Sequence, residues 1–230
     1  MGSFTYRFGE KRGSLAKSDY LGALATAVVA TLVAVGVLRL VEVRPAEATF
    51  PGKNGKIAFQ SDRGGSYEIY TMNRNGKKID KLTTNRTPDE DPAFSPNGKR
   101  IAFVCDRDGD SDIYKMTVKG SKLVQLTTNT KKFERDPSWS PDGKKILFRS
   151  DRHGSSDIYK MNLKGHKVVR LTTDPAVDED PAFSPDGKKI AFESERDGDS
   201  DIYKMTVKGR KLVQLTSDPA TTFGADWAVR

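Results

Sequence analysis

The chain has 230 residues, 39 Lys and Arg against 31 Asp and Glu, a formal net charge of +8 and one cysteine. A single cysteine excludes an intrachain disulfide, so the stability of the fold must come from packing and backbone hydrogen bonds. The mild basic excess is compatible with an anionic partner but is typical of an ordinary solvated surface, and we expect no nucleic-acid partner.

The N-terminal residues 1–48 predict an export signal or a membrane anchor. Basic side chains precede an uncharged apolar stretch over residues 21–38, and a small-x-small cleavage pattern follows at residues 46–48. The apolar stretch is also long enough to stay in the bilayer, so a cleaved signal and an anchor both remain open. In either case we expect the rest of the chain outside the cytoplasm, in the periplasm or at the cell surface, with membrane contact only through this segment.

The remaining residues, 49–230, contain one sequence pattern four times, at intervals of 44, 45 and 44 residues. An acidic residue followed by Ile-Tyr marks each occurrence, at residues 68–70, 112–114, 157–159 and 201–203. A period of this length indicates a propeller or a solenoid, in which each unit buries its apolar faces against its neighbours. We therefore expect a single repeat domain over residues 49–230.

One repeat, residues 91–128, reads as four short strands separated by turns. The expected strands cover residues 93–94, 100–105, 112–118 and 122–126, with turn-forming Pro, Asn, Asp and Gly residues between them. Apolar residues occur on both faces of the two middle strands, which indicates a sheet that is covered on both sides. Four antiparallel strands with both faces buried are typical of a propeller blade.

Four motifs recur in the same order, starting at Asp91, Asp136 and Asp180, and the later ones also occur in residues 56–84. They are D-P-x-[FW]-S-P-[DN]-G-K, I-x-F-x-[SC]-[DE]-R, D-I-Y-x-M and L-T. This succession resembles the WD-repeat-like blade of TolB-type β-propellers, over residues 50–230. The resemblance implies an all-β propeller of four-stranded antiparallel blades. It implies no single activity, because such blades occur in binding proteins, peptidase-associated propellers and some lyases. The mixed helix–strand domain of TolB itself is not expected here.

The end of the chain repeats the first strand of a blade. Trp227 lies 44 residues after Phe183, so residues 225–228 begin a fifth unit. We expect this strand to complete the first blade and to close a ring of four blades, whereas TolB-type rings usually have six. Phe50, which lies 44 residues before Phe94, is the competing candidate for the same place.

No constellation of catalytic residues is recognisable in the sequence. The two histidines, His153 and His166, lie in turns of one repeat, and the nucleophile-elbow, zincin, paired-cysteine and phosphate-loop motifs are missing from the sequence. We therefore expect a protein that is not an enzyme. The alternative is a carbohydrate-active or metal-dependent propeller enzyme of the cell envelope, which needs acidic residues or histidines that converge on the central channel.

An alternating run of aspartates is the candidate metal site. Its members surround Gly109 in the hairpin between the two middle strands of the second repeat: Asp106, Asp108, Asp110 and Asp112. Calcium binds several oxygen ligands from a short loop. The spacing departs from the EF-hand pattern, and Asp and Gly also form ordinary hairpin turns, so we favour a turn with no cofactor. A Ca²⁺ site remains the alternative, in the second and fourth repeats only.

An arginine follows an acidic residue at the same position of every repeat, as Arg63, Arg107, Arg152 and Arg196. One interpretation is a basic ring at a mouth of the channel. We favour a structural interpretation, in which an ion pair or hydrogen bond between blades is copied by the repetition.

Lysines gather in the turns between the first and second strands and between the third and fourth strands of each repeat. These turns leave a blade on the same face, so we expect a basic face and a more acidic opposite face. The candidate binding residues of the basic face are Lys99, Lys122, Lys144, Lys145, Lys167, Lys188, Lys189 and Lys211. We expect an exported, non-catalytic binding or scaffold module whose partner is an envelope protein or an anionic or glycan polymer. A monomer is expected, and a dimer that shares blades is the alternative.

Overall fold

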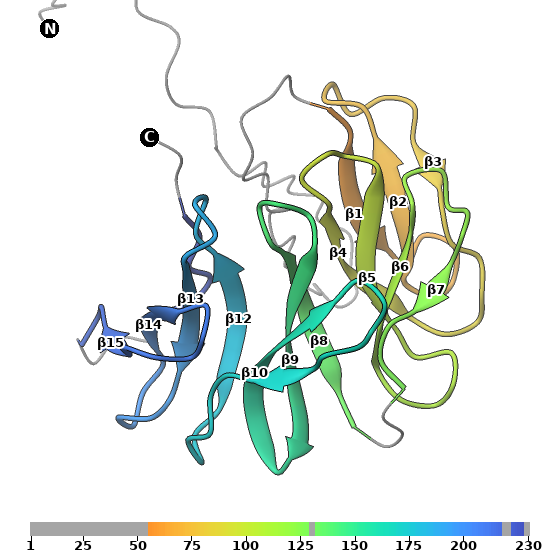
Figure 1. Cartoon of the computed structure of the whole chain (residues 1–230). Helices are drawn as coiled ribbons and strands as arrows, with labels where there is room; N and C mark the ends of the chain where they lie inside the picture. The colour runs from red at the N-terminus through yellow and green to blue at the C-terminus, as the bar shows by residue number, and fades with distance from the viewer. Residues whose placement is uncertain (1–54, 129–131, 218–221, 228–230) are drawn as a thin grey trace, which may run out of the picture. The chain divides into compact units, whose positions relative to one another are not determined.

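The computed structural model describes residues 55–128, 132–217 and 222–227. The expected export segment over residues 1–48 and the alternative strand at Phe50 lie outside these residues. The described residues form fifteen β-strands, β1 to β15 (Figure 1). They contain no helix that is long and apolar enough to cross a membrane.

The strands form four antiparallel sheets, one for each repeat of the sequence. The first sheet has three strands: β1 (Ile57–Ser61), β2 (Glu68–Met72) and β3 (Asp80–Lys81). The second sheet has four: β4 (Asp89–Phe94), β5 (Arg100–Cys105), β6 (Asp112–Thr117) and β7 (Val124–Gln125). The third sheet contains β8 (Glu134–Trp139), β9 (Lys145–His153), β10 (Ser155–Asn162) and β11 (Val169–Arg170). The fourth contains β12 (Asp178–Phe183), β13 (Lys189–Ser194), β14 (Asp201–Thr206) and β15 (Val213–Gln214). The expected all-β class is confirmed, and the expected four-stranded antiparallel blade is confirmed in the second, third and fourth sheets.

The turn between the first two strands of a blade follows from its Ser-Pro-Asn-Gly or Ser-Pro-Asp-Gly sequence. In the second sheet, the Gly98 N–H donates to the Ser95 carbonyl at 2.8 Å, and Gly98 has a φ of 64°, a left-handed angle that glycine adopts without strain. The Ser95 hydroxyl oxygen accepts from the Arg100 N–H at 2.9 Å, which closes the turn. The motif therefore sets the end of β4 and the start of β5.

We call the first strand of each four-stranded sheet (β4, β8 and β12) its inner strand and the fourth its outer strand. Each inner strand contains a bulge at the aspartate that precedes its proline. Asp91, Asp136 and Asp180 have φ values of 49°, 56° and 46°, and the register with the second strand shifts at this point in all three sheets. Aspartate is among the residues that adopt a left-handed backbone most readily. The bulge is thus a regular feature of the blade.

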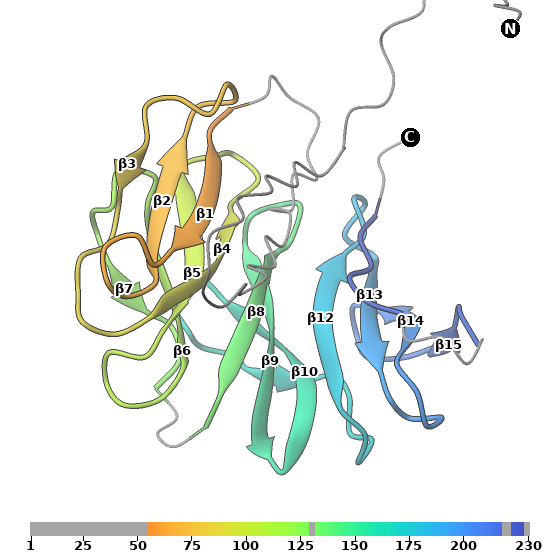
Figure 2. The same cartoon turned by 180° about the vertical axis from the view of Figure 1, so that it is seen from behind.

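The hydrophobic core lies between neighbouring sheets. Between the second and third sheets, Phe148 and Tyr159 belong to the same buried cluster as Val104 and Ile113. Similar clusters join the first sheet to the second and the third to the fourth. Burial of a side chain of this size contributes about 1.5–3 kcal/mol. Each sheet therefore depends on its neighbours, and Figure 2 shows the sheets following one another in chain order.

The junctions between sheets repeat the same contacts. A glycine in the turn before the fourth strand of a blade approaches a leucine carbonyl of the preceding sheet, in the pairs Gly120–Leu82, Gly165–Leu126 and Gly209–Leu171. A Cβ added at Gly165 would lie 1.9 Å from the Leu126 oxygen, so this position requires glycine. A lysine ammonium also donates to a carbonyl of the following sheet, in the pairs Lys115–Leu163 and Lys160–Val207.

The expected closure of the first sheet by the C-terminal strand does not occur in the structure. The first sheet has no fourth strand among the described residues, and residues 222–227 form no strand. Instead, the Thr222 N–H donates to the Ser200 carbonyl at 2.9 Å, and the Ser200 hydroxyl donates to the Thr222 carbonyl at 3.1 Å. These hydrogen bonds hold the segment against the fourth sheet.

Candidate functional site

The eight candidate lysines are all exposed and belong to two kinds of turn. Five lie at the turn between the first and second strands, Lys99, Lys144, Lys145, Lys188 and Lys189, and three before the fourth strand, Lys122, Lys167 and Lys211. The two kinds of turn contact each other, because the Val118 N–H donates to the Lys99 carbonyl at 3.1 Å and the Val207 N–H to the Lys188 carbonyl at 3.2 Å. These lysines therefore lie at the same end of their sheets, and we call this surface the basic face.

Three lysines of the basic face have a left-handed backbone. Lys122, Lys167 and Lys211 have φ values of 55°, 55° and 56°, and Lys78 in the first sheet has a φ of 54°. This conformation costs a residue with a side chain about 1–2 kcal/mol. Glycine would be the less strained residue at each position, yet each turn carries a lysine.

The four repeated arginines are held inside their own blades. Arg196 donates to both carboxylate oxygens of Asp178, at 2.8 and 3.1 Å, and its guanidinium lies 4.7 Å from the ring centre of Tyr203. The equivalent ion pairs are Arg107–Asp89 and Arg152–Glu134, with the same stacking on Tyr114 and Tyr159. Arg63 stacks on Phe59 and Tyr70. The structural interpretation holds, with the correction that these ion pairs join two strands of one blade rather than two blades.

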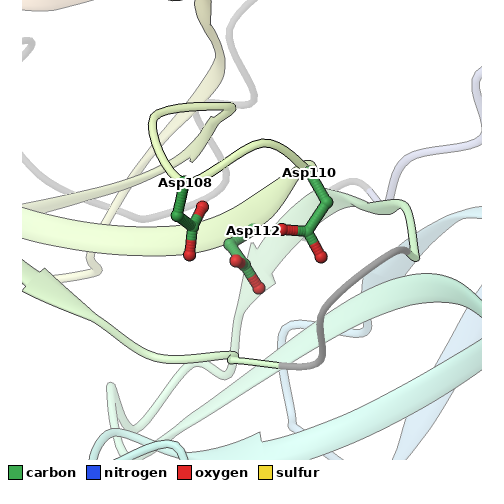
Figure 3. A group of neighbouring side chains, drawn as sticks. All are labelled: Asp108, Asp110 and Asp112. Carbon is green, nitrogen blue, oxygen red and sulfur yellow. The ribbon is translucent and has the colours of Figure 1, made fainter.

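Three of the four candidate aspartates come together in the hairpin between β5 and β6 (Figure 3). Carboxylate oxygens of Asp108, Asp110 and Asp112 lie within 4.8 Å of one another, and Asp112 is fully buried. Asp106 does not join them, because its carboxylate accepts a hydrogen bond from the Ser111 hydroxyl at 2.7 Å. The fourth sheet repeats the group with Asp197, Asp199 and Asp201.

The hydrogen bonds of this group fit a turn better than a cation site. The Gln125 amide donates to Asp108 at 2.6 Å and to Asp112 at 2.9 Å, and the Thr127 hydroxyl donates to Asp112 at 2.7 Å. Calcium takes about six to eight oxygen ligands, more than three side chains supply here. Burial, opposed by the Thr127 hydrogen bond and assisted by the charge of Glu134, raises the pKa of Asp112 to about 7. The turn remains our prediction for this hairpin.

The first and third sheets place a cation beside the equivalent buried acid. Arg170 contacts Asp157 at 2.7 Å in the third sheet, where the aspartate is 0% exposed. Lys81 contacts Glu68 at 3.2 Å in the first sheet, where the glutamate is 1% exposed. Both cations stand at the sequence position of Gln125. One position on the outer strand therefore decides whether the buried acid has a cation beside it.

Sequence reasoning missed a series of ion pairs along the inner strands. Arg135 contacts Glu90 at 3.1 Å, and Arg149 contacts both Asp136, at 2.7 Å, and Glu179. The Arg135–Glu90 pair joins the third sheet to the second, the Arg149–Glu179 pair joins the third sheet to the fourth, and the Arg149–Asp136 pair lies within the third sheet. Part of the signal was present in the sequence, since Glu90 and Arg135 occupy one repeat position with opposite charges, whereas Arg149, the partner of Glu179, stands at another position.

The two histidines lie at opposite ends of β10 and do not form one site. His153 is the last residue of β9, just before β10, and its Nδ1 atom lies 2.6 Å from the Tyr159 hydroxyl. His166 belongs to the turn that follows β10. A hollow of about 200 Å³ lies on the third sheet and is lined by Phe133, Arg135, Arg149, Asp151 and Ser156. No histidine lines this hollow.

Four antiparallel sheets that pack in chain order through the same junctions define a β-propeller repeat protein. The model of the TolB beta propeller domain family matches residues 45–136, 87–173 and 128–230. The chain belongs to this family.

Individual TolB proteins match the chain over parts of their length. The Tol-Pal system proteins TolB of Geobacter sulfurreducens and Geobacter metallireducens are 49% and 47% identical to it over 45 residues, which are 20% of this chain and 10% of each relative. The solved structure of a putative TolB from Agrobacterium tumefaciens is 27% identical, with a TM-score of 0.64, over 70% of this chain and 60% of that one. TolB from Acinetobacter baumannii is 28% identical, with a TM-score of 0.65, over 74% and 44%. The chain thus spans less than two thirds of these relatives.

The same fold also occurs in enzymes. An oligogalacturonate lyase from Vibrio parahaemolyticus is 14% identical, with a TM-score of 0.59, over 74% of this chain and 52% of that one. At this identity the likeness concerns the fold alone. It therefore carries no conclusion about catalysis in this chain.

Proposed function

We propose that the chain is an exported binding module, without catalytic activity, that presents its basic face to an anionic partner in the cell envelope. The observation that carries the proposal is the gathering of eight exposed lysines on turns at one end of three packed sheets. Family membership supports it, because the curated relatives are named for the Tol-Pal system of the envelope. The apolar stretch over residues 21–38 supports export.

The packing of the sheets suits recognition by turns. The turns of the basic face are fixed by backbone hydrogen bonds to each other, and the sheets beneath them share buried cores. Rigid turns lose little conformational entropy when they bind a partner. Charged groups that are held on a fixed surface also steer an oppositely charged partner toward it.

The left-handed lysines allow the binding role to be separated from the fold. In the triple variant Lys122→Gly, Lys167→Gly and Lys211→Gly, each glycine relieves a backbone cost of about 1 kcal/mol, partly offset by its greater freedom in the unfolded chain. We expect unchanged or higher stability in urea together with weaker retention of envelope partners in a pull-down from envelope extract. A parallel glycan array shows whether the retained partner is a protein or an anionic glycan.

The matched control is Arg86→Gln, which removes an exposed cation from the connector at the opposite end of the first sheet. Retention by this variant should equal that of the unsubstituted chain. Retention should also weaken as salt rises, because exposed charges are screened beyond about 10 Å at 0.1 M salt. Equal retention by the triple variant and by the unsubstituted chain would reject the basic face as the binding surface.

Export and the lack of catalysis are tested separately. Protease added to intact cells should cleave the repeat domain while a cytoplasmic control protein stays whole, and full protection of an unprocessed chain would contradict export. Saturable turnover of an envelope polysaccharide by the purified chain would favour the alternative, a carbohydrate-active propeller enzyme. A binding module should retain the polymer and leave its length unchanged.

A further inference from the structure

The described C-terminal residues lie on the fourth sheet as β4 lies on the first sheet. The Thr222 N–H donates to the Ser200 carbonyl at 2.9 Å. At the equivalent place, the Asp89 N–H donates to the Tyr67 carbonyl at 2.8 Å. The two segments therefore begin with the same contact to the preceding sheet.

The bulge of an inner strand is repeated as well. Gly224 has a φ of 68°, as Asp91 has a φ of 49° at the equivalent position. The Asp91 N–H donates to the Gln60 side-chain oxygen at 2.7 Å, and the Gly224 N–H donates to the carboxylate of Glu193, which is the residue equivalent to Gln60. Residues 222–227 thus make the contacts of an inner strand, and the described residues contain no further strand of that blade.

The first sheet lacks the strand that residues 222–227 resemble. In the part of the chain that the structure describes, nothing pairs with β1 on the side away from β2. Ile57 and Phe59 of β1 are partly exposed, whereas the equivalent Ile101 and Phe103 of β5 are fully buried. An open strand edge beside apolar side chains is a surface that pairs readily with another strand.

The fourth sheet also exposes a leucine that the turn of a following sheet covers in the second and third sheets. Leu215 is 48% exposed, whereas the equivalent Leu126 and Leu171 are 4% and 8% exposed beneath the glycine turns of the next sheet. Gly76 is the glycine of the first sheet that matches those turns, and a Cβ added there would have nothing within 4 Å. The first sheet thus offers a covering turn, and the fourth sheet offers an uncovered leucine.

Among the described residues of one copy, the strands of these two sheets make no contacts like those that join neighbouring sheets. The principal contacts join the first sheet to the second, the second to the third and the third to the fourth. We propose that a second copy closes the ring, with residues 222–227 of each copy forming the inner strand of the other copy's first sheet. Two copies, each with the four sheets that the structure describes, give eight blades, within the range of about four to eight that propellers have, whereas three copies would exceed it.

The repeat equivalence specifies the register of this contact. Asp226 corresponds to Ala93, which pairs with Ala102 in the second sheet. Ala102 corresponds to Ala58 in the first sheet. Asp226 of one copy therefore faces Ala58 of the other copy, at a separation that a disulfide between two cysteines can span.

A disulfide between two differently tagged copies tests the proposal in the full-length chain. Cys105 is first replaced by serine, the residue that stands at the equivalent position of the other three repeats. Ala58→Cys in one copy and Asp226→Cys in the other are then produced together in the same cells and oxidised. We expect a covalent product that contains both tags, and no product from either variant alone.

A matched pair of surface substitutions checks that the product reports this interface. Leu215→Arg places a charge in the proposed contact, and it should lower the linked fraction at least about tenfold, the effect of about 1.4 kcal/mol. Leu212→Arg changes a leucine that is 44% exposed just before β15 and should leave the linked fraction unchanged. Equal fractions in the two variants would contradict the interface.

Two results of the disulfide experiment overturn the proposal. A chain with both cysteines that forms only an intrachain disulfide would show that a single copy closes its own ring. A folded chain that forms no disulfide would show that the edge of β1 is covered by other residues, such as 50–54, or by a different protein. Circular dichroism of each variant establishes that the sheets are folded in either case.

Discussion

The second and third blades share one backbone plan but surround the same buried aspartate differently. In the third blade, Asp157 has the guanidinium of Arg170 at 2.7 Å. In the second, Asp112 has the amide of Gln125 at 2.9 Å and two further carboxylates beside it. A buried carboxylate keeps its charge only where a cation or several hydrogen bonds compensate for lost water. Two blades with the same strands can therefore differ in electrostatics, because the residue on the outer strand, Gln125 or Arg170, decides whether the buried aspartate has a cation beside it.

The largest expected effect comes from making the third blade resemble the second. Arg170→Gln leaves Asp157 buried without its cation, and we expect the free energy of unfolding at pH 7 to fall by about 2–3 kcal/mol, measured by urea denaturation. The loss stays below that of a fully buried pair because the Arg170 side chain is 28% exposed. The double variant with Asp157→Asn should recover part of the stability. A double variant as unstable as Arg170→Gln alone would show that the guanidinium acts by packing.

An intermediate effect is expected from neutralising the acid of the second blade. The pKa of Asp112 is raised from 3.8 to about 7, mainly by burial, so its contribution to stability is complete below pH 4 and is lost as the pH rises to 7. Asp112→Asn removes this loss. Relative to the unsubstituted chain, the free energy of unfolding of the variant should rise by about 1–2 kcal/mol between pH 4 and pH 8. Urea denaturation at the two pH values measures this difference. Burial also raises the pKa of Asp157, but Arg170 opposes the shift, so Asp157→Asn should show a smaller gain.

The smallest expected effect concerns calcium. The Gln125 amide already donates to Asp108 and Asp112, so we expect millimolar calcium to leave the melting temperature unchanged, as measured by calorimetry. If the acidic groups bound calcium, the melting temperature would instead rise. The variant with Gln125→Arg and Gln214→Arg, which copies the cation of the third blade into both groups, would then lose that rise. Such a pair of results would replace the turn by a calcium site.

The strands and turns were predictable because they follow from alternating apolar residues and turn-forming residues. These signals act over a few positions and recur in every repeat. The Ser95 turn and the four-stranded sheets follow from these short-range signals. The placement of the lysine turns at one end of the sheets was predictable as well, because antiparallel strands put alternate turns at the same end of a sheet. Ring closure did not follow, because it depends on which first sheet meets the fourth sheet, and no short-range signal in the sequence decides that contact.

The buried charges were predictable only in part. The aspartate group was visible in the sequence, but Asp106 was assigned to it by spacing alone and instead binds Ser111. The arginine pairs were expected between blades and lie within them, since stacking on Tyr203 or Tyr114 turns the guanidinium back toward its own sheet. The opposite charges of Glu90 and Arg135 become meaningful only once the first strands of successive blades are known to be neighbours, and Glu179 pairs instead with Arg149 on β9.

The recurring junction between blades has a consequence for the order in which the protein assembles. The lysine donors and their carbonyl acceptors in the next blade are only 48 and 47 residues apart along the chain. Contacts about one repeat apart cost less loop-closure entropy than contacts across the whole domain, so neighbouring blades should associate before distant ones. Each blade can therefore dock on its predecessor as soon as it has been synthesised, while later repeats are still on the ribosome. An interrupted or slow synthesis would leave a shorter stack of folded blades rather than a collapsed chain.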